Sequence, residues 1–514
     1  MQALLDHLAA ARDVSTPLLV ITTPDQPAIA AAIAEHLNGS TPIVTWDRSR
    51  GFAGRNDKGR EAIGVVCRQE KISPDQMPMA SADPANAFRM AIQFPKGTIL
   101  IAFSLNRFLH EANAGEAVQA ILNLRDAYKS DQRTFIGLSP DFELPSELRH
   151  DTIVMDDPLP DEDHYSLIVR DIYEQADLPK PPGEFVSKAA LSVRGLSAFE
   201  AEQSLAMALA LSPKGDGIDL TEAWALKRAA VAKIKGLTMT LTGPDVRDLR
   251  GLDQIIKRLS SLWQGPQPPL LVVRVDEIDK SFGGLSGAGD NTGVTQYQHQ
   301  QFLTQLEDNG WIGAILVGIR GSGKTILTQS IGVAHGAPTI AMDTGAMKAS
   351  KLGASEEYIR DSFRTIHSIG GRRVLVLATC NKLDVLPAEL LRRFKLGIYY
   401  FDLMTPEERA SLWPVYLKKY GHPLDSPRPD DTDWTGAEIR NCCEIAYLEK
   451  STIAEVGRDS IVPVTRSDPR GVEALRAQAD ACGFLSVSYP GTYRRPGLAV
   501  AAPMQGRRIN RKES

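Results

Sequence analysis

The chain has 514 residues, of which 43% are hydrophobic and 24% charged, and its formal net charge is −5. These values are typical of a globular protein with roughly three or four domains, and they argue against a dedicated nucleic-acid binder. No apolar run reaches the ~18 residues of a membrane-spanning helix, and the amino terminus lacks the pattern of a secretory signal. The five cysteines show no paired metal-ligand spacing, so we expect a cytoplasmic protein without membrane association.

The elements predicted along the chain change character several times. Residues 1–160 alternate apolar strand-like runs with helical stretches, which predicts an α/β domain with a parallel sheet. Residues 161–240 carry apolar residues at helical spacing and predict a helical domain or linker. A second α/β block covers residues 241–404, and residues 405–465 are again helical. Residues 466–514 are polar, basic and rich in turn-forming residues, so we expect a loosely held, partly flexible tail.

The second α/β block contains the sequence "GIRGSGKT", which fits the phosphate-loop pattern G-x-x-x-x-G-K-[ST]. An apolar strand precedes it and a helix follows, as a phosphate loop requires. Lys324 would reach the β- and γ-phosphates, and Thr325 would ligate Mg²⁺. The alternative is a glycine-rich turn with an incidental Lys-Thr. It would require the complete eight-residue pattern to occur by chance between a strand and a helix. The loop residues expected to hold the nucleotide are Gly318, Gly321, Ser322, Gly323, Lys324, Thr325 and Ile326.

An acidic pair ends the apolar strand in "LLVVRVDEIDKSF", residues 270–282. Asp276 would hold Mg²⁺, usually through water, and Glu277 would polarise the attacking water. The alternative is an acidic cap for the next helix, and Arg274 favours it, because a buried strand rarely carries a charge. Asn381 ends the next strong strand, where its amide could orient the attacking water, although such a residue is more often part of a turn.

Residues 246–446 together resemble an AAA+ ATPase of the classical AAA clade, in particular the ycf-type AAA proteins of plastids and cyanobacteria. The Walker A and Walker B motifs resemble "ILVGIRGSGKT" and "VDEIDKSFGGLSGAGDNTG". The sensor 1 strand resembles "VLVLATCN", and the arginine-finger segment resembles "LPAELLRRF". The remaining matches are "DLRGLDQI" before the nucleotide site, "KLGASEEYIRDSF" at the pore loop and "WTGAEIRNCCEIA" at the lid helix.

This resemblance implies a P-loop AAA+ core with a helical lid, which binds ATP and Mg²⁺ between the subunits of a ring. It adds Gly251, Gly436 and Ala437 to the expected nucleotide-binding residues. It also implies that Arg392 or Arg393 of a neighbouring subunit acts on the γ-phosphate, unless both are ordinary surface charges of a helix. The resemblance extends weakly to residues 42–165, where the sheet has no phosphate loop because "ITTPDQPA" follows its first strand. We therefore expect a degenerate ATPase-like domain there.

The chain departs from the family in three places. Its Walker B block precedes Walker A, and only "RTIHSIGGRR" remains where the family has that block. Arg392 and Arg393 are adjacent, whereas the family separates its two arginines by two residues and follows them with Asp. Lys351 occupies the pore-loop slot that usually holds an aromatic residue, which argues against a strong polypeptide-threading unfoldase.

The displaced Walker B strand can still take its usual place in the sheet. Family sheets have it between the sensor 1 strand and the second strand, and parallel neighbours need only a crossover of a dozen or more residues. The segments of this chain are long enough for such crossovers. We therefore predict a permuted strand order that brings Asp276 and Glu277 beside Thr325 at the carboxyl ends of the strands.

The leading hypothesis is an oligomeric ATPase that couples hydrolysis to the remodelling of a macromolecular partner. Glu277, Asn381, Arg392 and Arg393 are its candidate catalytic residues, and Asp276 and Thr325 its metal ligands. A nucleotide-gated binding or scaffold module with slow or no hydrolysis is the alternative. Nucleic-acid binding by the basic tail is a third and weaker reading, because such tails are usually only solvated ends. It would use Arg494, Arg495, Arg507, Arg508, Arg511 and Lys512, with Tyr489 and Tyr493 between them.

Overall fold

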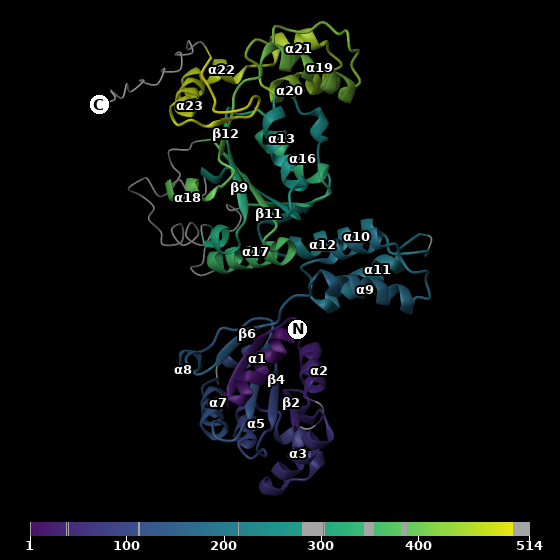
Figure 1. Cartoon of the computed structure of the whole chain (residues 1–514), viewed down its shortest axis with the longest axis vertical. Coiled ribbons are helices and arrows are strands. Elements are labelled where there is room, and N and C mark those ends of the chain that lie inside the picture. The colour runs from purple at the N-terminus through teal and green to yellow at the C-terminus, as the bar shows by residue number, and fades with distance from the viewer. Residues whose placement is uncertain are drawn as a thin grey trace, which may run out of the picture. The chain divides into compact units, whose positions relative to one another are not determined.

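The computed structural model describes residues 2–37, 39, 41–111, 114–213, 215–279, 302, 304–343, 354–381 and 388–496. The chain divides into two compact units, Met1–Ala223 and Trp224–Ser514, and each is described by itself (Figure 1). None of the helices in the described ranges combines the length and the apolar character that crossing a membrane requires.

The first unit contains a six-stranded sheet. Its strands are, in spatial order, β3 (Gly51–Gly54), β2 (Ile43–Asp47), β4 (Ile99–Phe103), β5 (Thr134–Ser139), β1 (Leu18–Thr22) and β6 (Ile153–Asp156). Neighbours run parallel except β2 and β3, which form an antiparallel pair. The helices of this part are α1 (Gln2–Asp13), α2 (Gln26–His36), α3 (Asp57–Glu70), α4 (Met77–Ala80), α5 (Pro84–Ala91), α6 (Leu105–Leu109), α7 (Ala114–Tyr128) and α8 (Ser146–Arg149), with a 3₁₀ turn at Pro74–Gln76.

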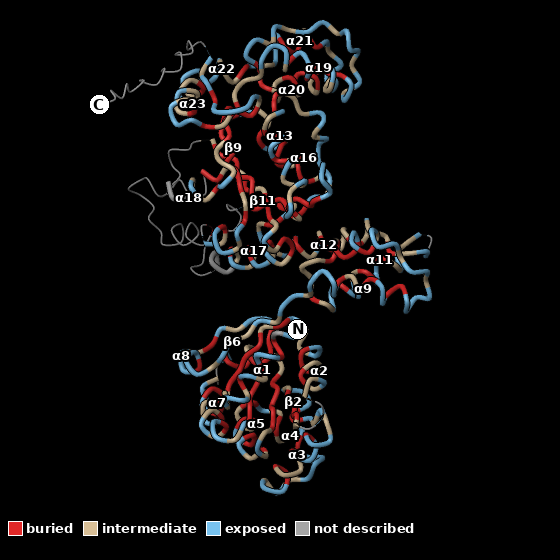
Figure 2. Tube along the Cα trace, in the orientation of Figure 1, coloured by how far each residue is buried: buried red, intermediate tan, exposed pale blue. Residues whose placement is uncertain are grey.

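This sheet is buried on both faces, because the side chains of a strand alternate between its two sides. Leu19 and Ile21 of β1 pack in a cluster with residues of α1 and α2. Leu18 and Val20 pack in the opposite cluster, which includes residues of α3, α5 and α7. Figure 2 shows the buried strands in red between these two layers. The α/β character expected for this part of the chain, with its parallel sheet, is confirmed.

Four helices follow the first sheet: α9 (Glu162–Gln175), α10 (Gly183–Val193), α11 (Ala198–Ala210) and α12 (Leu220–Ala232), and the boundary between the two units falls within α12. Two buried tyrosines of α9 tie the connections between these helices to the core. The Tyr165 hydroxyl donates to the Leu196 carbonyl at 2.7 Å, and the Tyr173 hydroxyl accepts from the Ile218 N–H at 3.1 Å. Residues 161–232 therefore contain four helices, and the next strand begins at Leu237.

The second unit contains a seven-stranded sheet. Its strands are, in spatial order, β13 (Leu485–Ser486), β12 (Ile398–Phe401), β9 (Ile312–Gly318), β11 (Val374–Cys380), β8 (Leu271–Val275), β10 (Thr339–Met342) and β7 (Leu237–Thr240). All neighbours are parallel except β7 and β10. Helices of the core are α13 (Asp253–Ser260), α16 (Lys324–Ala334), α17 (Ala354–Gly370) and α18 (Ala388–Arg393), with 3₁₀ turns at Val246–Asp248 and Ser261–Gln264. The remaining helices are α19 (Pro406–Tyr420), α20 (Gly436–Glu449), α21 (Ile453–Asp459), α22 (Val464–Ser467) and α23 (Pro469–Ala481).

Strand β8 lies between β11 and β10, although it comes before β9 in the chain. Its Val273 is paired with Val376 of β11 on one side and with Ile340 of β10 on the other. The connection from β10 to β11 contains α17 and passes over β8, which the crossover rule for parallel strands permits. The expected position of this strand is confirmed. It is stable there because Leu271, Val272, Val273 and Val275 are fully buried against both layers.

The carboxyl-terminal segment differs from the expected tail. Residues 469–481 form α23, and β13 adds to the sheet beside β12. Tyr493 is buried, and its hydroxyl donates to Asp402 Oδ2 at 2.6 Å. The expectation of a loosely held tail is therefore wrong for residues 466–496. The sequence did not reveal this, because a two-residue strand and a few scattered apolar side chains leave no periodic signal. Residues 497–514, with Arg507, Arg508, Arg511 and Lys512, lie outside the described residues.

Candidate functional site

The phosphate loop, residues 318–325, joins β9 to α16. Gly318 has φ +149°, and a Cβ atom there would lie 2.1 Å from the Phe401 carbonyl oxygen, so only glycine fits. Gly321 has φ +80°, and its Cβ would lie 2.7 Å from Thr435 Oγ1. Ser322 donates its hydroxyl hydrogen to the Ile319 carbonyl at 2.7 Å. The loop is therefore a tight cradle of backbone ahead of a helix amino terminus, which suits an anion.

Lys324 is buried at the start of α16. Its ammonium group donates to the carbonyl oxygens of Gly318 at 2.7 Å and Ile319 at 2.9 Å. Burial lowers the pKa of Lys324 and the charge of Arg320 also lowers it, whereas Cys380, Asp279 and Glu277 raise it, and the resulting pKa is about 8. The ammonium group is thus held by carbonyl oxygens of its own loop. A bound phosphate would replace these acceptors with negatively charged oxygens, which form stronger hydrogen bonds with Lys324.

A cavity of about 260 Å³, here called the phosphate-loop cavity, collects most of the predicted site residues. Glu277 after β8, Asn381 after β11 and Ala437 of α20 line it together with the loop. The structure also brings in three residues that the sequence reasoning missed: Arg320, Thr379 and Arg440. The loop residues that line the cavity are Arg320, Gly321, Gly323, Lys324, Thr325 and Ile326.

Glu277 and Asn381 meet at the ends of neighbouring strands. Asn381 Nδ2 donates to Glu277 Oε1 at 3.3 Å, and the Glu277 N–H donates to Thr379 Oγ1 at 3.0 Å. Glu277 has φ +49°, in the left-handed region that non-glycine residues rarely adopt. Such a conformation persists only where the surroundings hold it, and it is frequent at functional sites.

Asp276 faces a different environment from its neighbour. It lines a second cavity of about 560 Å³, the edge cavity, together with Arg274, Glu277 and Asp343. Arg274 Nε lies 2.9 Å from Asp276 Oδ2, and Thr379 Oγ1 donates to Asp276 Oδ1 at 3.3 Å. Burial raises the pKa of Asp276, and Glu277 and Asp343 also raise it, whereas Arg274 and Thr379 lower it. The structure thus places Glu277 in the same cavity as Thr325, while Asp276 lines the adjoining one.

Asp279 is a further acid that sequence reasoning missed. It is buried, and its Oδ1 accepts the N–H of Asn381 at 3.1 Å. The only signal in the sequence was a third acid in "DEID", one helical turn after Asp276. Asp279 positions the backbone of Asn381 and adds negative potential near Lys324.

The lid helix α20 is attached to the phosphate loop at its amino terminus. The Ala437 N–H donates to the Gly321 carbonyl at 3.2 Å, and a Cβ on Gly321 would lie 3.0 Å from the Ala437 Cβ. Gly436 packs beside this contact, since a Cβ there would lie 3.3 Å from Leu412 Cδ2. Gly251 does not line the phosphate-loop cavity; its carbonyl accepts the Ser488 hydroxyl at 2.7 Å. Its role in nucleotide binding stays a prediction.

The predicted arginine fingers lie at the end of α18. Arg393 forms an ion pair with Glu307 of the same chain, and Arg392 is exposed. Neither residue lines the phosphate-loop cavity, so a role at a neighbouring subunit stays a prediction. Lys351, at the pore-loop slot, lies outside the described residues.

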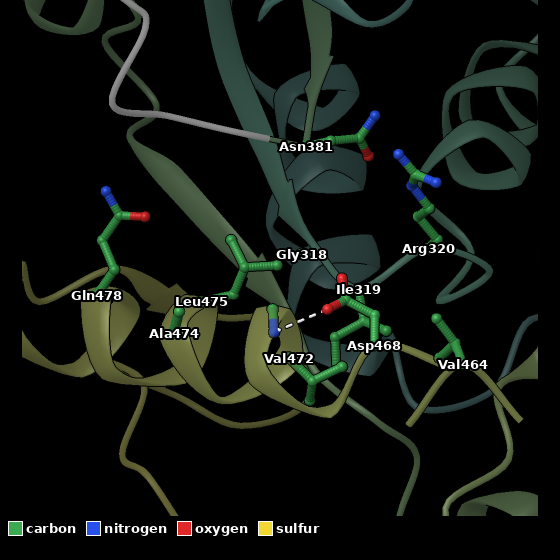
Figure 3. Close-up of a pocket in the computed structure, with 11 residues that line it drawn as sticks. Gly318, Ile319, Arg320, Asn381, Val464, Asp468, Val472, Ala474, Leu475 and Gln478 are labelled. Atoms are coloured by element: carbon green, nitrogen blue, oxygen red, sulfur yellow. Dashed lines mark hydrogen bonds between the residues drawn. The ribbon is translucent and has the colours of Figure 1, made fainter. Parts of the chain in front are cut away.

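A larger cavity of about 640 Å³, the α23 cavity, adjoins the phosphate loop on another side (Figure 3). Ile319 and Arg320 contribute from the loop, and Val472 and Leu475 from α23. Arg320 and Asn381 line both this cavity and the phosphate-loop cavity. The carboxyl-terminal segment therefore forms part of the surroundings of the predicted site.

The residues present fit a nucleotide with Mg²⁺. Within the described ranges there is no cluster of three or more His, Cys, Asp or Glu side chains that could hold a metal by itself. Mg²⁺ usually keeps several waters and is held by one or two protein groups together with substrate phosphates. Thr325, which lines the phosphate-loop cavity, and Asp276, which lines the adjoining edge cavity, would supply such groups.

Comparison with known proteins agrees with these features. Residues 1–156 match the N-terminal domain of SpoVK-like AAA ATPases. The AAA domain-containing protein ycf46 of Gracilaria tenuistipitata var. liui is 22% identical over 417 residues, which cover 71% of this chain and 77% of the relative. That of Pyropia yezoensis is 22% identical over 520 residues, which cover 90% of this chain and 95% of the relative. The resemblance expected from the motifs is confirmed: the chain is similar to the ycf46 AAA domain-containing proteins, and its first 156 residues are similar to the N-terminal domain of SpoVK-like AAA ATPases.

Proposed function

We propose that this protein binds ATP with Mg²⁺ in the phosphate-loop cavity, hydrolyses it, and works as a homo-oligomeric ring that remodels a macromolecular partner. The observation that carries the catalytic part is the meeting of Glu277, Lys324, Thr325 and Asn381 around one cavity. The similarity to AAA ATPases supports an ATPase of this type. The ring and the partner are inferred from the resemblance alone.

Each side chain has a role that its position supports. The loop N–H groups and Lys324 bind the β- and γ-phosphates, and Thr325 and Asp276 hold Mg²⁺, which supplies positive charge to the transferring phosphoryl group. Glu277 accepts the proton of the attacking water, and Asn381 holds the Glu277 carboxylate through the 3.3 Å hydrogen bond. Thr379 fixes the backbone of Glu277 in its unusual conformation. All of these groups belong to a single chain.

A steady-state ATPase assay tests the proposal with wild type, Lys324→Ala and Glu277→Gln. We expect turnover in wild type, loss of nucleotide binding in Lys324→Ala, and a loss of about 100-fold or more in kcat for Glu277→Gln with binding retained. Glu449→Gln and Lys450→Ala are matched controls, because both residues are exposed and lie at the far end of α20. Normal turnover by Glu277→Gln would exclude the displaced strand from catalysis.

The alternative is a nucleotide-gated binding module, and one observation favours it. Arg274 and Asp276 form an ion pair at 2.9 Å, so the proposed Mg²⁺ ligand already has a cationic partner. Wild-type protein that binds ATP tightly and changes its oligomeric state, but releases phosphate no faster than Glu277→Gln, would establish this alternative.

A further inference from the structure

A hairpin near the carboxyl terminus contacts the turn that precedes α13. Residues 484–493, here called the carboxyl-terminal hairpin, fold back on themselves, and the Ser486 N–H donates to the Gly491 carbonyl at 3.0 Å. The Ser488 hydroxyl of this hairpin donates to the Gly251 carbonyl at 2.7 Å, across 237 positions of the chain. The turn around Gly251 is therefore tied to a segment that follows the lid in the sequence.

The same hairpin caps the amino terminus of α13. Leu252, at the N-cap position of this helix, has no polar side chain with which to cap it. The Val487 carbonyl instead accepts the N–H groups of Gln254 at 3.0 Å and Ile255 at 3.2 Å. The first N–H groups of a helix have no partner within the helix, and a side chain usually satisfies them. Here the hairpin does so with its backbone, which fixes the point where α13 begins.

The turn held in this way lies between the phosphate loop and the lid. A Cβ atom on Gly323 would lie 3.5 Å from Leu252 Cδ1, so the Leu252 side chain rests against the loop. Gly251 has φ +71°, and a Cβ atom there would lie 2.9 Å from the carboxylate carbon of Glu408 in α19. Leu252 and Val487 are also buried in one cluster with residues of α16. A shift of the hairpin would therefore move a wall that adjoins the phosphate loop.

The hairpin can act as a fixed support because it belongs to the same sheet as the phosphate loop. Its strand β13 pairs with β12, and β12 pairs on its other side with β9, which leads into the loop. At the far end of the hairpin, the Tyr493 hydroxyl donates to Asp402 Oδ2 at 2.6 Å, just after β12. The support and the loop are thus attached to neighbouring strands of one rigid layer.

We infer that Ser488 is a positioning residue for nucleotide binding, which holds the Gly251 turn beside the phosphate loop so that this turn contacts the nucleoside part of ATP. The inference rests on the proposed function and assigns part of the nucleotide affinity to the carboxyl-terminal hairpin. The phosphates bind to the loop N–H groups and to Lys324. The ribose and base extend beyond the loop, and the Gly251 turn is the wall that Ser488 holds there. Ser488 therefore acts on the affinity for nucleotides and not on the affinity for a bare phosphate chain.

The experiment compares Ser488→Ala with Ser426→Ala, whose hydroxyl also donates to a backbone carbonyl at 2.7 Å but lies in the connection from α19 to α20. In Ser488→Ala we expect KM for ATP, and Kd for both ATP and ADP, to rise about two- to tenfold, the effect of one lost hydrogen bond. The value of kcat should stay unchanged, because the lost contact is equal in the ground state and the transition state. Inhibition by inorganic tripolyphosphate, which has no nucleoside, should also stay unchanged. Ser488→Thr keeps the hydroxyl and should bind nucleotides nearly as wild type does, and Ser426→Ala should show no change.

Gly251→Ala displaces the same turn from the side of the lid, and it keeps the test available if Ser488→Ala does not fold. The added methyl group would strike the Glu408 carboxylate, so Kd for ATP should again rise without a change in the inhibition by tripolyphosphate. In the double variant, Ser488→Ala should add less than it does alone, because both substitutions act on one turn.

Three results would count against the inference. An unchanged Kd for ATP in both variants, with wild type active, would overturn it and leave the proposed function standing. Equal weakening of ATP and tripolyphosphate would also overturn it, because the hairpin would then act on the phosphate loop itself. A wild type that neither binds nor hydrolyses ATP would remove the proposed function, and the inference with it.

Discussion

Glu277 Oε1 accepts a hydrogen bond of 3.3 Å from Nδ2 of Asn381, which lies 104 residues later in the chain. The contact exists because β8 and β11 are parallel neighbours and end together at the same edge of the sheet, with Val275 paired to Ala378. An active site of this kind depends on which strands are neighbours and not on their order in the sequence. The displacement of the acidic strand therefore leaves the proposed chemistry within reach.

Asn381→Ala should reduce turnover while leaving ATP binding nearly intact. The substitution removes the amide that holds the Glu277 carboxylate, so we expect kcat to fall by about tenfold to a hundredfold, at the lower end of what a positioned acid–base group contributes. Steady-state kinetics and nucleotide titration measure the two effects separately. Asn123→Ala, at an exposed position of α7, is the matched control. A rise in KM with unchanged kcat would contradict a positioning role.

Thr379→Val should destabilise the second unit. The valine keeps the shape of the side chain but removes the acceptor of the Glu277 N–H and the donor to Asp276. We expect the free energy of unfolding to fall by about 1–3 kcal/mol, the usual cost of leaving a buried polar group without a partner. Denaturant unfolding measures it, and Thr379→Ser, which keeps the hydroxyl, should stay close to wild type. Equal loss in both variants would point to packing instead.

Lys324 should make the stability of the protein depend on pH in a defined window. Its pKa is about 8 in the folded protein against 10.5 ordinarily, so between these values the unfolded chain binds more protons. The free energy of unfolding then rises with pH across this window, by on the order of 3 kcal/mol from this group. Below pH 8 Lys324 is protonated in both the folded and the unfolded chain, so it does not change the free energy of unfolding with pH. The test is to measure the free energy of unfolding of wild type and of Lys324→Met across this pH window. Wild type should show the rise, and Lys324→Met should not.

Arg274→Leu should lower the Mg²⁺ concentration that turnover requires. Arg274 and Mg²⁺ would compete for the same Asp276 carboxylate, which now lies 2.9 Å from the guanidinium group. Removal of the arginine leaves that carboxylate to the metal, so we expect a several-fold fall in the half-saturating Mg²⁺ concentration. Arg274→Lys keeps the positive charge and should resemble wild type. A higher Mg²⁺ requirement in Arg274→Leu would argue that Asp276 is not a metal ligand.

Tyr493→Phe should test how firmly the carboxyl-terminal segment is attached. The tyrosine hydroxyl donates to Asp402 Oδ2, and Arg476 Nε donates to the other carboxylate oxygen at 2.9 Å. Loss of one hydrogen bond to a charged, half-buried group should cost about 1.5–3 kcal/mol in unfolding free energy. Tyr447→Phe, at a position that is 59% exposed, is the control and should have no effect.

The local parts of the site could be predicted from sequence because each depends on a short stretch. The phosphate loop is encoded by eight consecutive residues that must include glycine where a Cβ would strike Phe401 or Thr435. Apolar runs likewise predicted the strands that carry Glu277 and Asn381. By contrast, Arg320 and Arg440 carried no signal, because an arginine in a loop or on a helix is usually solvated. Asp279 and Thr379 matter through partners more than 100 positions away, and no local pattern reports such partners.

The sequence by itself predicted most strands of the two sheets and the loop where a triphosphate could be cradled, since these follow from apolar spacing and glycine geometry. Only the tertiary structure decided that Glu277 lines the cavity of Lys324 while Asp276 lines the adjoining one. It also decided that the segment around Tyr493 belongs to the core. The physical reason is the same in each case. Side-chain direction at the end of a strand and the burial of short segments depend on the neighbours that the sheet brings together.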